Sequence, residues 1–144
     1  MRHLLTFCLL LLICVGCGGT QSYTSDTPDL ENVPEEDIVK LESDALEYEI
    51  IIIEPGFNAW LATMARPEGF YSQSYMESRN NVMVQEWNTR VLQPGKYDPN
   101  MYQLQIEYRP GINYGYDLNY KLYNYFIYFQ LTYKQRLSSF VPRI

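Results

Sequence analysis

The chain has 144 residues, with 11 Lys and Arg against 17 Asp and Glu, and its formal net charge at pH 7 is −6. This acidic balance argues against nucleic acid as a partner, because phosphate binding needs clustered Lys and Arg. The one histidine, His3, and all three cysteines lie in the first 17 residues, so we expect no His- or Cys-based catalysis, no metal site and no cofactor in the remaining chain.

Residues 1–16 have the layout of a bacterial export signal, with a basic start and an apolar run over residues 4–15. The run is shorter than the about 20 apolar residues that a transmembrane helix needs. Val15-Gly16-Cys17 resembles the lipobox of bacterial lipoproteins, although Cys14 stands where that pattern usually has Leu. The resemblance implies cleavage before Cys17 and acylation of this residue, for example with palmitate. An ordinary cleaved signal is the alternative.

Residues 17–45 are predicted to be a flexible acidic tether after the lipid. The segment is rich in Ser, Thr, Asp and Glu and has few large apolar side chains, a composition that does not favour a packed core. About 25 flexible residues reach roughly 25 to 30 Å, enough to hold a domain away from a membrane surface. Residues 46–144 are then expected to form a single domain.

The first element expected in this domain is a strand over residues 46–53, which begins with alternating residues and becomes apolar on both faces. Glu54-Pro55-Gly56 ends it. A short helix is predicted over residues 59–65, with Asn58 as its cap.

A longer helix is predicted over residues 74–92. Ser74 and Glu77 have the spacing of a capping box, and helical periodicity follows as far as Pro94. Arg79, Glu86 and Arg90 recur at spacings of seven and four, which predicts an ion-pair ladder with the carboxylate between the two cations. A ligand-binding role for these three side chains is the alternative.

A second strand is predicted over residues 102–108, where apolar and polar residues alternate after the turn at Asp98. The tyrosine-rich segment 117–137 fits both strand and helix periods, and its length without Gly or Pro favours a helix, capped by Asp117. This helix is apolar on two sides. It is therefore expected either between two layers or with one face free for a partner, and the face in question is Tyr120, Tyr123, Ile127 and Leu131.

The expected fold class is α+β: a small two-stranded sheet packed on three helices, in the order strand, helix, helix, strand, helix. Residues 47–137 resemble a family of short, uncharacterised lipoproteins of Bacteroidota, a domain of unknown function. The strings that carry the resemblance are Glu47-Tyr48-Glu49-Ile50-Ile51-Ile52-Ile53-Glu54-Pro55-Gly56-Phe57, Tyr71-Ser72-Gln73-Ser74-Tyr75, Glu86-Trp87-Asn88 and Asn119-Tyr120-Lys121-Leu122-Tyr123. The resemblance implies a fold and a place in the envelope but no activity.

Two functions are expected from the residues. The first is a non-catalytic, lipid-anchored binding or structural module of the cell envelope, on the outer membrane and facing the periplasm, with an envelope protein or a glycan as partner. Tyrosine is enriched at recognition surfaces, because it combines a large apolar area with a polar hydroxyl. The binding residues predicted for this module are Tyr114, Tyr116, Asn119, Tyr120 and Lys121. The alternative is an envelope hydrolase that uses a carboxylate pair, with Glu54, Glu86 and Asp98 as candidate acids and no established catalytic residue.

Overall fold

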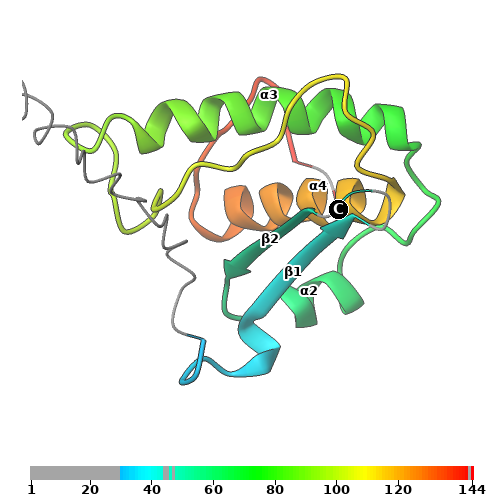
Figure 1. Cartoon of the computed structure of the whole chain (residues 1–144), viewed down its shortest axis with the longest axis horizontal. Helices are drawn as coiled ribbons and strands as arrows, with labels where there is room; N and C mark the ends of the chain where they lie inside the picture. Colours follow the sequence, from blue (N-terminus) through cyan, green and yellow to red (C-terminus); the bar gives the residue numbers. More distant parts are fainter. Residues whose placement is uncertain (1–29, 44–45, 47, 143) are drawn as a thin grey trace, which may run out of the picture. The chain divides into compact units, whose positions relative to one another are not determined.

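The structure is a computed structural model that describes residues 30–43, 46, 48–142 and 144. The predicted signal, the lipidated Cys17 and most of the predicted tether lie outside the described residues. Residues 31–144 form one compact unit. Within this unit, helix α4 (Tyr116–Thr132) contacts helix α3 (Gln73–Val91), strand β1 (Ile38–Ser43) and the short helix α2 (Phe57–Thr63) (Figure 1).

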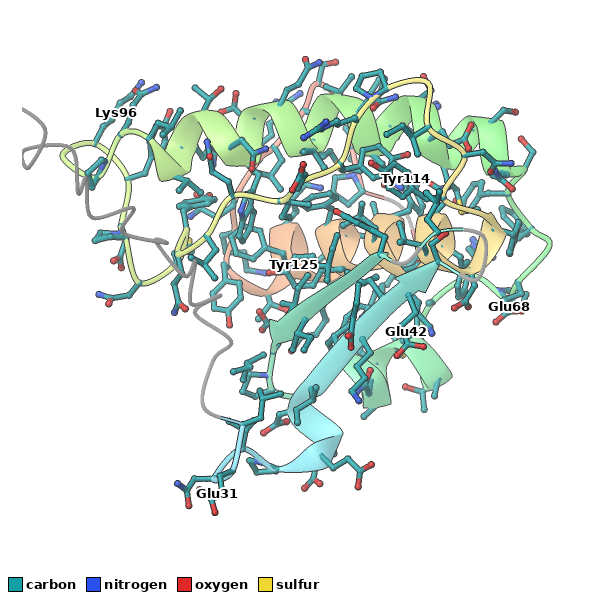
Figure 2. The ribbon with its side chains drawn as sticks, in the orientation of Figure 1. Glu31, Glu42, Glu68, Lys96, Tyr114 and Tyr125 are labelled. Atoms are coloured by element: carbon teal, nitrogen blue, oxygen red, sulfur yellow. The ribbon has the colours of Figure 1, made fainter. Side chains whose placement is uncertain are left out.

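The sheet is a two-stranded antiparallel pair of β1 and β2 (Tyr48–Ile53), with Val39 opposite Ile52 and Leu41 opposite Ile50. A 3-10 turn, η1 (Glu35–Asp37), precedes β1. Along β1, Val39 and Leu41 are buried while Lys40 and Glu42 are exposed, the alternation expected of a strand with one covered face (Figure 2 labels Glu42). Residues 38–43 were assigned to the tether, so the tether prediction is wrong there.

The predicted order of elements is also wrong, although the α+β class with two strands and three helices is confirmed. The order is strand, strand, helix, helix, helix. In the segment 102–108, Tyr102, Ile106 and Tyr108 are buried as predicted, but Leu104 is 67 % exposed and the segment forms no strand. Their backbone polar groups are bound by side chains of α3 instead: Asn88 exchanges two hydrogen bonds of 2.8 Å with Ile106, and Trp87 Nε1 donates to Leu104 O at 2.9 Å.

The helices form near their predicted positions, but their caps differ. Ser72, not Ser74, caps α3, because its Oγ accepts a hydrogen bond from Tyr75 N at 3.2 Å. Helix α2 begins after Gly56, whose φ of 79° suits glycine. Asn58 is no cap; its amide donates to Glu36 O at 2.9 Å and Ile38 O at 3.0 Å and so holds α2 against η1 and β1.

Helix α4 is the centre of the core, and the expectation that it lies between two layers is confirmed. Its two apolar sides are both covered: Leu118, Leu122 and Phe126 are 0 % exposed, while Tyr120, Tyr123 and Ile127 on the other side are 5 to 7 % exposed. Gly115 is the N-cap, and Asp117 lies in the first turn, so the predicted Asp117 cap is wrong. Tyr125, labelled in Figure 2, is one of eleven buried residues of this helix.

Candidate functional site

The five residues predicted for binding lie together around the start of α4, but three are in the interior. Tyr114, Asn119 and Tyr120 are 3 %, 0 % and 7 % exposed. The ring of Tyr116 stacks on Tyr120 with the centroids 6.1 Å apart, and Lys121 Nζ lies 2.8 Å from Asp117 Oδ2. These side chains are thus occupied mainly by contacts within the fold.

The phenol groups of this cluster attach the loop before α3 to α4. The hydroxyl of Tyr116 accepts from Gly69 N at 2.6 Å and donates to Tyr71 O at 3.3 Å. The Tyr120 hydroxyl donates to Arg66 O at 2.8 Å. Burial raises the pKa of Tyr120, with smaller contributions from Glu68 and Tyr116, so this phenol remains a hydrogen-bond donor at neutral pH.

The three candidate acids lie in separate surroundings. Glu54 is 6 % exposed and accepts a hydrogen bond from the Tyr133 hydroxyl at 2.8 Å. Burial raises the pKa of Glu54; the bond from Tyr133 opposes this change, and the negative charge of Asp37 adds to it. Among the described residues Glu54 is therefore an acid with a raised pKa, as a general acid requires, but it is covered by Tyr133.

Glu86 and Asp98 have other partners. Glu86 Oε1 lies 2.8 Å from Arg90 Nε, which confirms half of the predicted ladder. Burial alone would lower the pKa of Arg90, but its hydrogen bonds to Glu86 and Tyr102 raise it. Asp98 Oδ1 accepts from Asn100 N at 2.9 Å in an exposed turn. Within the described part of the chain, no hydrogen bond or ion pair joins two of the three acids.

The described part of the chain has neither a cluster of metal ligands nor a membrane-spanning helix. Within it, no three His, Cys, Asp or Glu side chains are grouped so that they could ligate a metal ion. None of its helices combines the length and apolar character needed to cross a bilayer.

A partly enclosed cavity with aromatic walls and one charged side chain lies between α3, α4 and the segment 138–142. It has a volume of about 280 Å³, just below the about 300 Å³ at which small-ligand sites begin. We call it the tyrosine pocket, and its walls include Tyr71, Tyr75, Arg79, Tyr123 and Phe140. Tyr75 and Arg79 are one turn apart on α3, and Tyr123 projects from the facing side of α4.

The rings of the tyrosine pocket are fixed by one another. Tyr71 stacks on Tyr75 with centroids 4.7 Å apart and planes 6° from parallel. Tyr123 meets both rings edge-on, at 5.3 Å from Tyr71 and 6.1 Å from Tyr75. Burial raises the pKa of Tyr123, and a hydrogen bond with Tyr75 adds to the effect, so the pocket keeps a neutral phenol in its wall.

Arg79 is the charged group of the tyrosine pocket. Its guanidinium carbon lies 3.4 Å from the centroid of the Tyr75 ring and 4.8 Å from that of Phe140, so the cation lies over two aromatic rings. The predicted pairing of Arg79 with Glu86 does not form, because the side chain turns to these rings instead. Its one hydrogen bond to a described residue is a 3.5 Å contact from Nη1 to Tyr75 O.

Comparison with known protein families assigns the chain to one of them. The sequence pattern of a family of unknown function, DUF6146, matches residues 4–141. The chain belongs to this family. The expected membership of a family without an assigned activity is thereby confirmed. No curated protein and no solved structure matches the chain.

Sequence reasoning missed the tyrosine pocket of this DUF6146 chain. One signal was present: Tyr71, Tyr75 and Arg79 follow one another at spacings of four, so they share one side of a helical turn. The other two walls gave no such signal, because Tyr123 lies 48 positions and Phe140 65 positions beyond Tyr75 in the printed numbering. The pocket depends on tertiary packing that brings α4 and the segment 138–142 to α3.

Proposed function

We propose that this DUF6146 chain is a lipid-anchored protein of a Bacteroidota cell envelope, held by a lipid on Cys17 at the outer membrane and facing the periplasm. The proposal rests on the sequence: an apolar run ends directly at Cys17, and Gly18 and Gly19 follow where a surface-export tag of such bacteria has acidic residues. The acidic residues beyond them oppose close contact with an anionic membrane.

The anchor is tested by the intact mass of the chain from the membrane fraction, wild type against Cys17→Ala. The expected result is an acylated wild-type chain that begins at Cys17 and an unacylated variant outside the membrane fraction. A wild-type chain without acyl groups contradicts the anchor.

We further propose that the domain is a non-catalytic binding module and that the tyrosine pocket is its ligand site. The observation that carries this proposal is the cation of Arg79, which lies over the rings of Tyr75 and Phe140 at the wall of a cavity of about 280 Å³. Aromatic walls with one oriented polar group are typical of small-ligand sites. Phe140 is 40 % exposed, so the rim of the pocket is accessible.

The pocket is tested on the full-length chain in detergent by thermal shift with a panel of neutral sugars, peptides and organic acids. A ligand of the pocket stabilises the wild type, loses this effect in Phe140→Ala, and keeps it in Leu92→Ala, since Leu92 is an exposed apolar residue at the far end of α3. If no compound shifts the midpoint, or if Phe140→Ala responds like Leu92→Ala, the tyrosine pocket is not the site.

The alternative, an envelope hydrolase with a carboxylate pair, depends on Glu54 and Asp37. Asp37 raises the pKa of Glu54, and its Oδ1 accepts from Gly56 N at 3.3 Å. The alternative predicts that Glu54→Gln abolishes a glycosidase or esterase activity of the wild-type chain. If the domain is a non-catalytic binding module, the wild-type chain has neither activity.

A further inference from the structure

The N–H groups of the Arg79 guanidinium are available to a ligand. The guanidinium carbon lies over the rings of Tyr75 and Phe140. Apart from the long contact to Tyr75 O, no hydrogen bond or ion pair links its N–H groups to a described residue. A guanidinium held against aromatic rings with such N–H groups can bind the two oxygens of an oxoanion in a bidentate manner.

We propose that the ligand of the tyrosine pocket is a small monocarboxylate with a ring-shaped body, such as an aromatic acid or a sugar acid. The inference rests on the proposed binding function and names the ligand class of the same site. In this arrangement Arg79 receives the carboxylate in its plane, and the ring of the ligand lies against Tyr71 and Tyr123.

The charge of the pocket favours a monoanion. Among the residues that the structure describes, its lining contains one cation, Arg79, and no Asp, Glu or Lys. A phosphate monoester, which carries about −1.5 to −2 charges at neutral pH, would need further donors or cations, and the chain as a whole carries a net charge of −6. One guanidinium matches one carboxylate in both charge and number of oxygens.

Two other polar side chains of the lining are already engaged by the fold. Gln130 donates to Phe126 O at 3.0 Å and accepts from Leu137 N at 2.9 Å. Ser138 Oγ accepts from Phe140 N at 3.2 Å and contacts Phe140 O at 3.4 Å. These bonds position the segment that closes the pocket, which leaves Arg79 and the tyrosine hydroxyls to recognise the polar group of a ligand, with Arg79 as the charged donor.

The aromatic walls select the body of the ligand. Tyr71 and Tyr123 are in edge-to-face contact at 5.3 Å and stand at 68° to one another, so a flat ring or the apolar face of a sugar can pack against them only from the cavity side. The volume of about 280 Å³ admits one such ring and excludes a polymer. The site therefore fits a monomeric acid or the acidic end group of a longer molecule.

The test is calorimetric titration of the full-length chain in detergent with benzoate against benzamide and with glucuronate against glucose. Phenyl phosphate and phenyl sulfate serve as further probes. We expect benzoate or glucuronate to bind about tenfold or more tightly than its neutral counterpart, because a hydrogen-bonded charge pair contributes more than a neutral hydrogen bond. Arg79→Gln should abolish this preference, and Arg79→Lys, which keeps the charge without the fork, should lose part of it. Arg109→Gln, an exposed arginine outside the pocket, is the matched control and should bind as the wild type does.

Each other outcome overturns a defined part of the proposal. Equal binding of acids and neutral counterparts, or acid binding that survives in a folded Arg79→Gln variant, overturns the ligand class and leaves the binding module standing. Tighter binding of phenyl phosphate or phenyl sulfate overturns the choice of carboxylate. If neither these probes nor the neutral compounds of the wider panel bind, both the ligand class and the proposed function are wrong.

Discussion

The side-chain amide of Asn80 on α3 donates to Asn119 on α4, to the backbone oxygen at 3.1 Å and to Oδ1 at 3.2 Å. Both residues are 0 % exposed. The Tyr108 hydroxyl donates to the same Oδ1 at 2.7 Å, and Asn119 itself donates to Gly115 O at 2.8 Å. One buried amide thus joins α3, α4 and the segment 102–108.

Asn119→Ala should lower the free energy of unfolding by on the order of 2 to 4 kcal/mol, because the buried Tyr108 hydroxyl loses its acceptor and the buried Asn80 amide loses one of its two acceptors. Urea denaturation with an unchanged m-value measures the effect. Lys121→Ala, which breaks an ion pair with Asp117 at the helix surface, is the control and should cost less than about 1 kcal/mol. Equal effects of the two substitutions would show that the buried network is not a main source of stability.

Two serines near the start of α3, Ser72 and Ser74, are possible N-caps, and substitution of each can distinguish them. Ser72 Oγ accepts the hydrogen bond from Tyr75 N, whereas Ser74 lies inside the helix. Ser72→Ala should therefore cost about 0.5 to 2 kcal/mol, and Ser74→Ala should be close to neutral. Thermal unfolding of both variants measures the difference. A larger effect at Ser74 would restore the capping box with Glu77 that the sequence pattern indicates.

Local sequence patterns were enough to place the helices and strand β2, but not the elements that pack against them. The helix predicted at 74–92 exists because its periodicity is clear, and the one at 117–137 because its length decides between two competing periods; both apolar sides of α4 are largely buried. Strand β1 was missed because the charged residues Lys40 and Glu42 fit the composition of a tether, and only pairing with β2 reveals their role as the exposed face of a strand.

The error at residues 102–108 has a different cause. Alternation of Tyr102, Leu104, Ile106 and Tyr108 indicates a segment with one covered side, and three of these side chains are buried while Leu104 is exposed. It does not require a neighbouring strand, because side chains can bind the same backbone groups. The predicted binding cluster differs from the tyrosine pocket for a similar reason. The tyrosines near the start of α4 are neighbours in sequence, while the walls of the tyrosine pocket come from three distant segments.

The reciprocal pair of Asn88 and Ile106 gives a prediction for this segment. Asn88 Oδ1 accepts from Ile106 N, and its Nδ2 donates to Ile106 O, both at 2.8 Å. Asn88→Ala should leave these two backbone groups without partners and raise the hydrogen-exchange rate of the Ile106 amide while the amides of α4 remain protected. Asn88→Asp, which can still accept from Ile106 N, should keep most of this protection. Unchanged exchange in Asn88→Ala would contradict the role of this side chain.

Glu54 makes the stability of the chain depend on pH. Burial raises its pKa in the folded chain above the value of 4.5 for a free carboxyl, and Asp37 adds to the change although the hydrogen bond from Tyr133 opposes it. Between 4.5 and the folded pKa, the folded chain binds more protons than the unfolded chain, so this group stabilises the fold below pH 4.5 and its contribution is lost as the pH rises through the folded pKa.

Glu54→Gln removes the titration but keeps an oxygen that can accept from Tyr133. The free energy of unfolding of Glu54→Gln relative to wild type should therefore increase from about pH 4.5 upward and level off above the folded pKa. Urea titrations at a series of pH values measure this difference. Glu49→Gln, on the exposed side of β2, controls for the loss of one negative charge. A difference between Glu54→Gln and wild type that stays constant over this range would mean that Glu54 has the same pKa in the folded and unfolded chains.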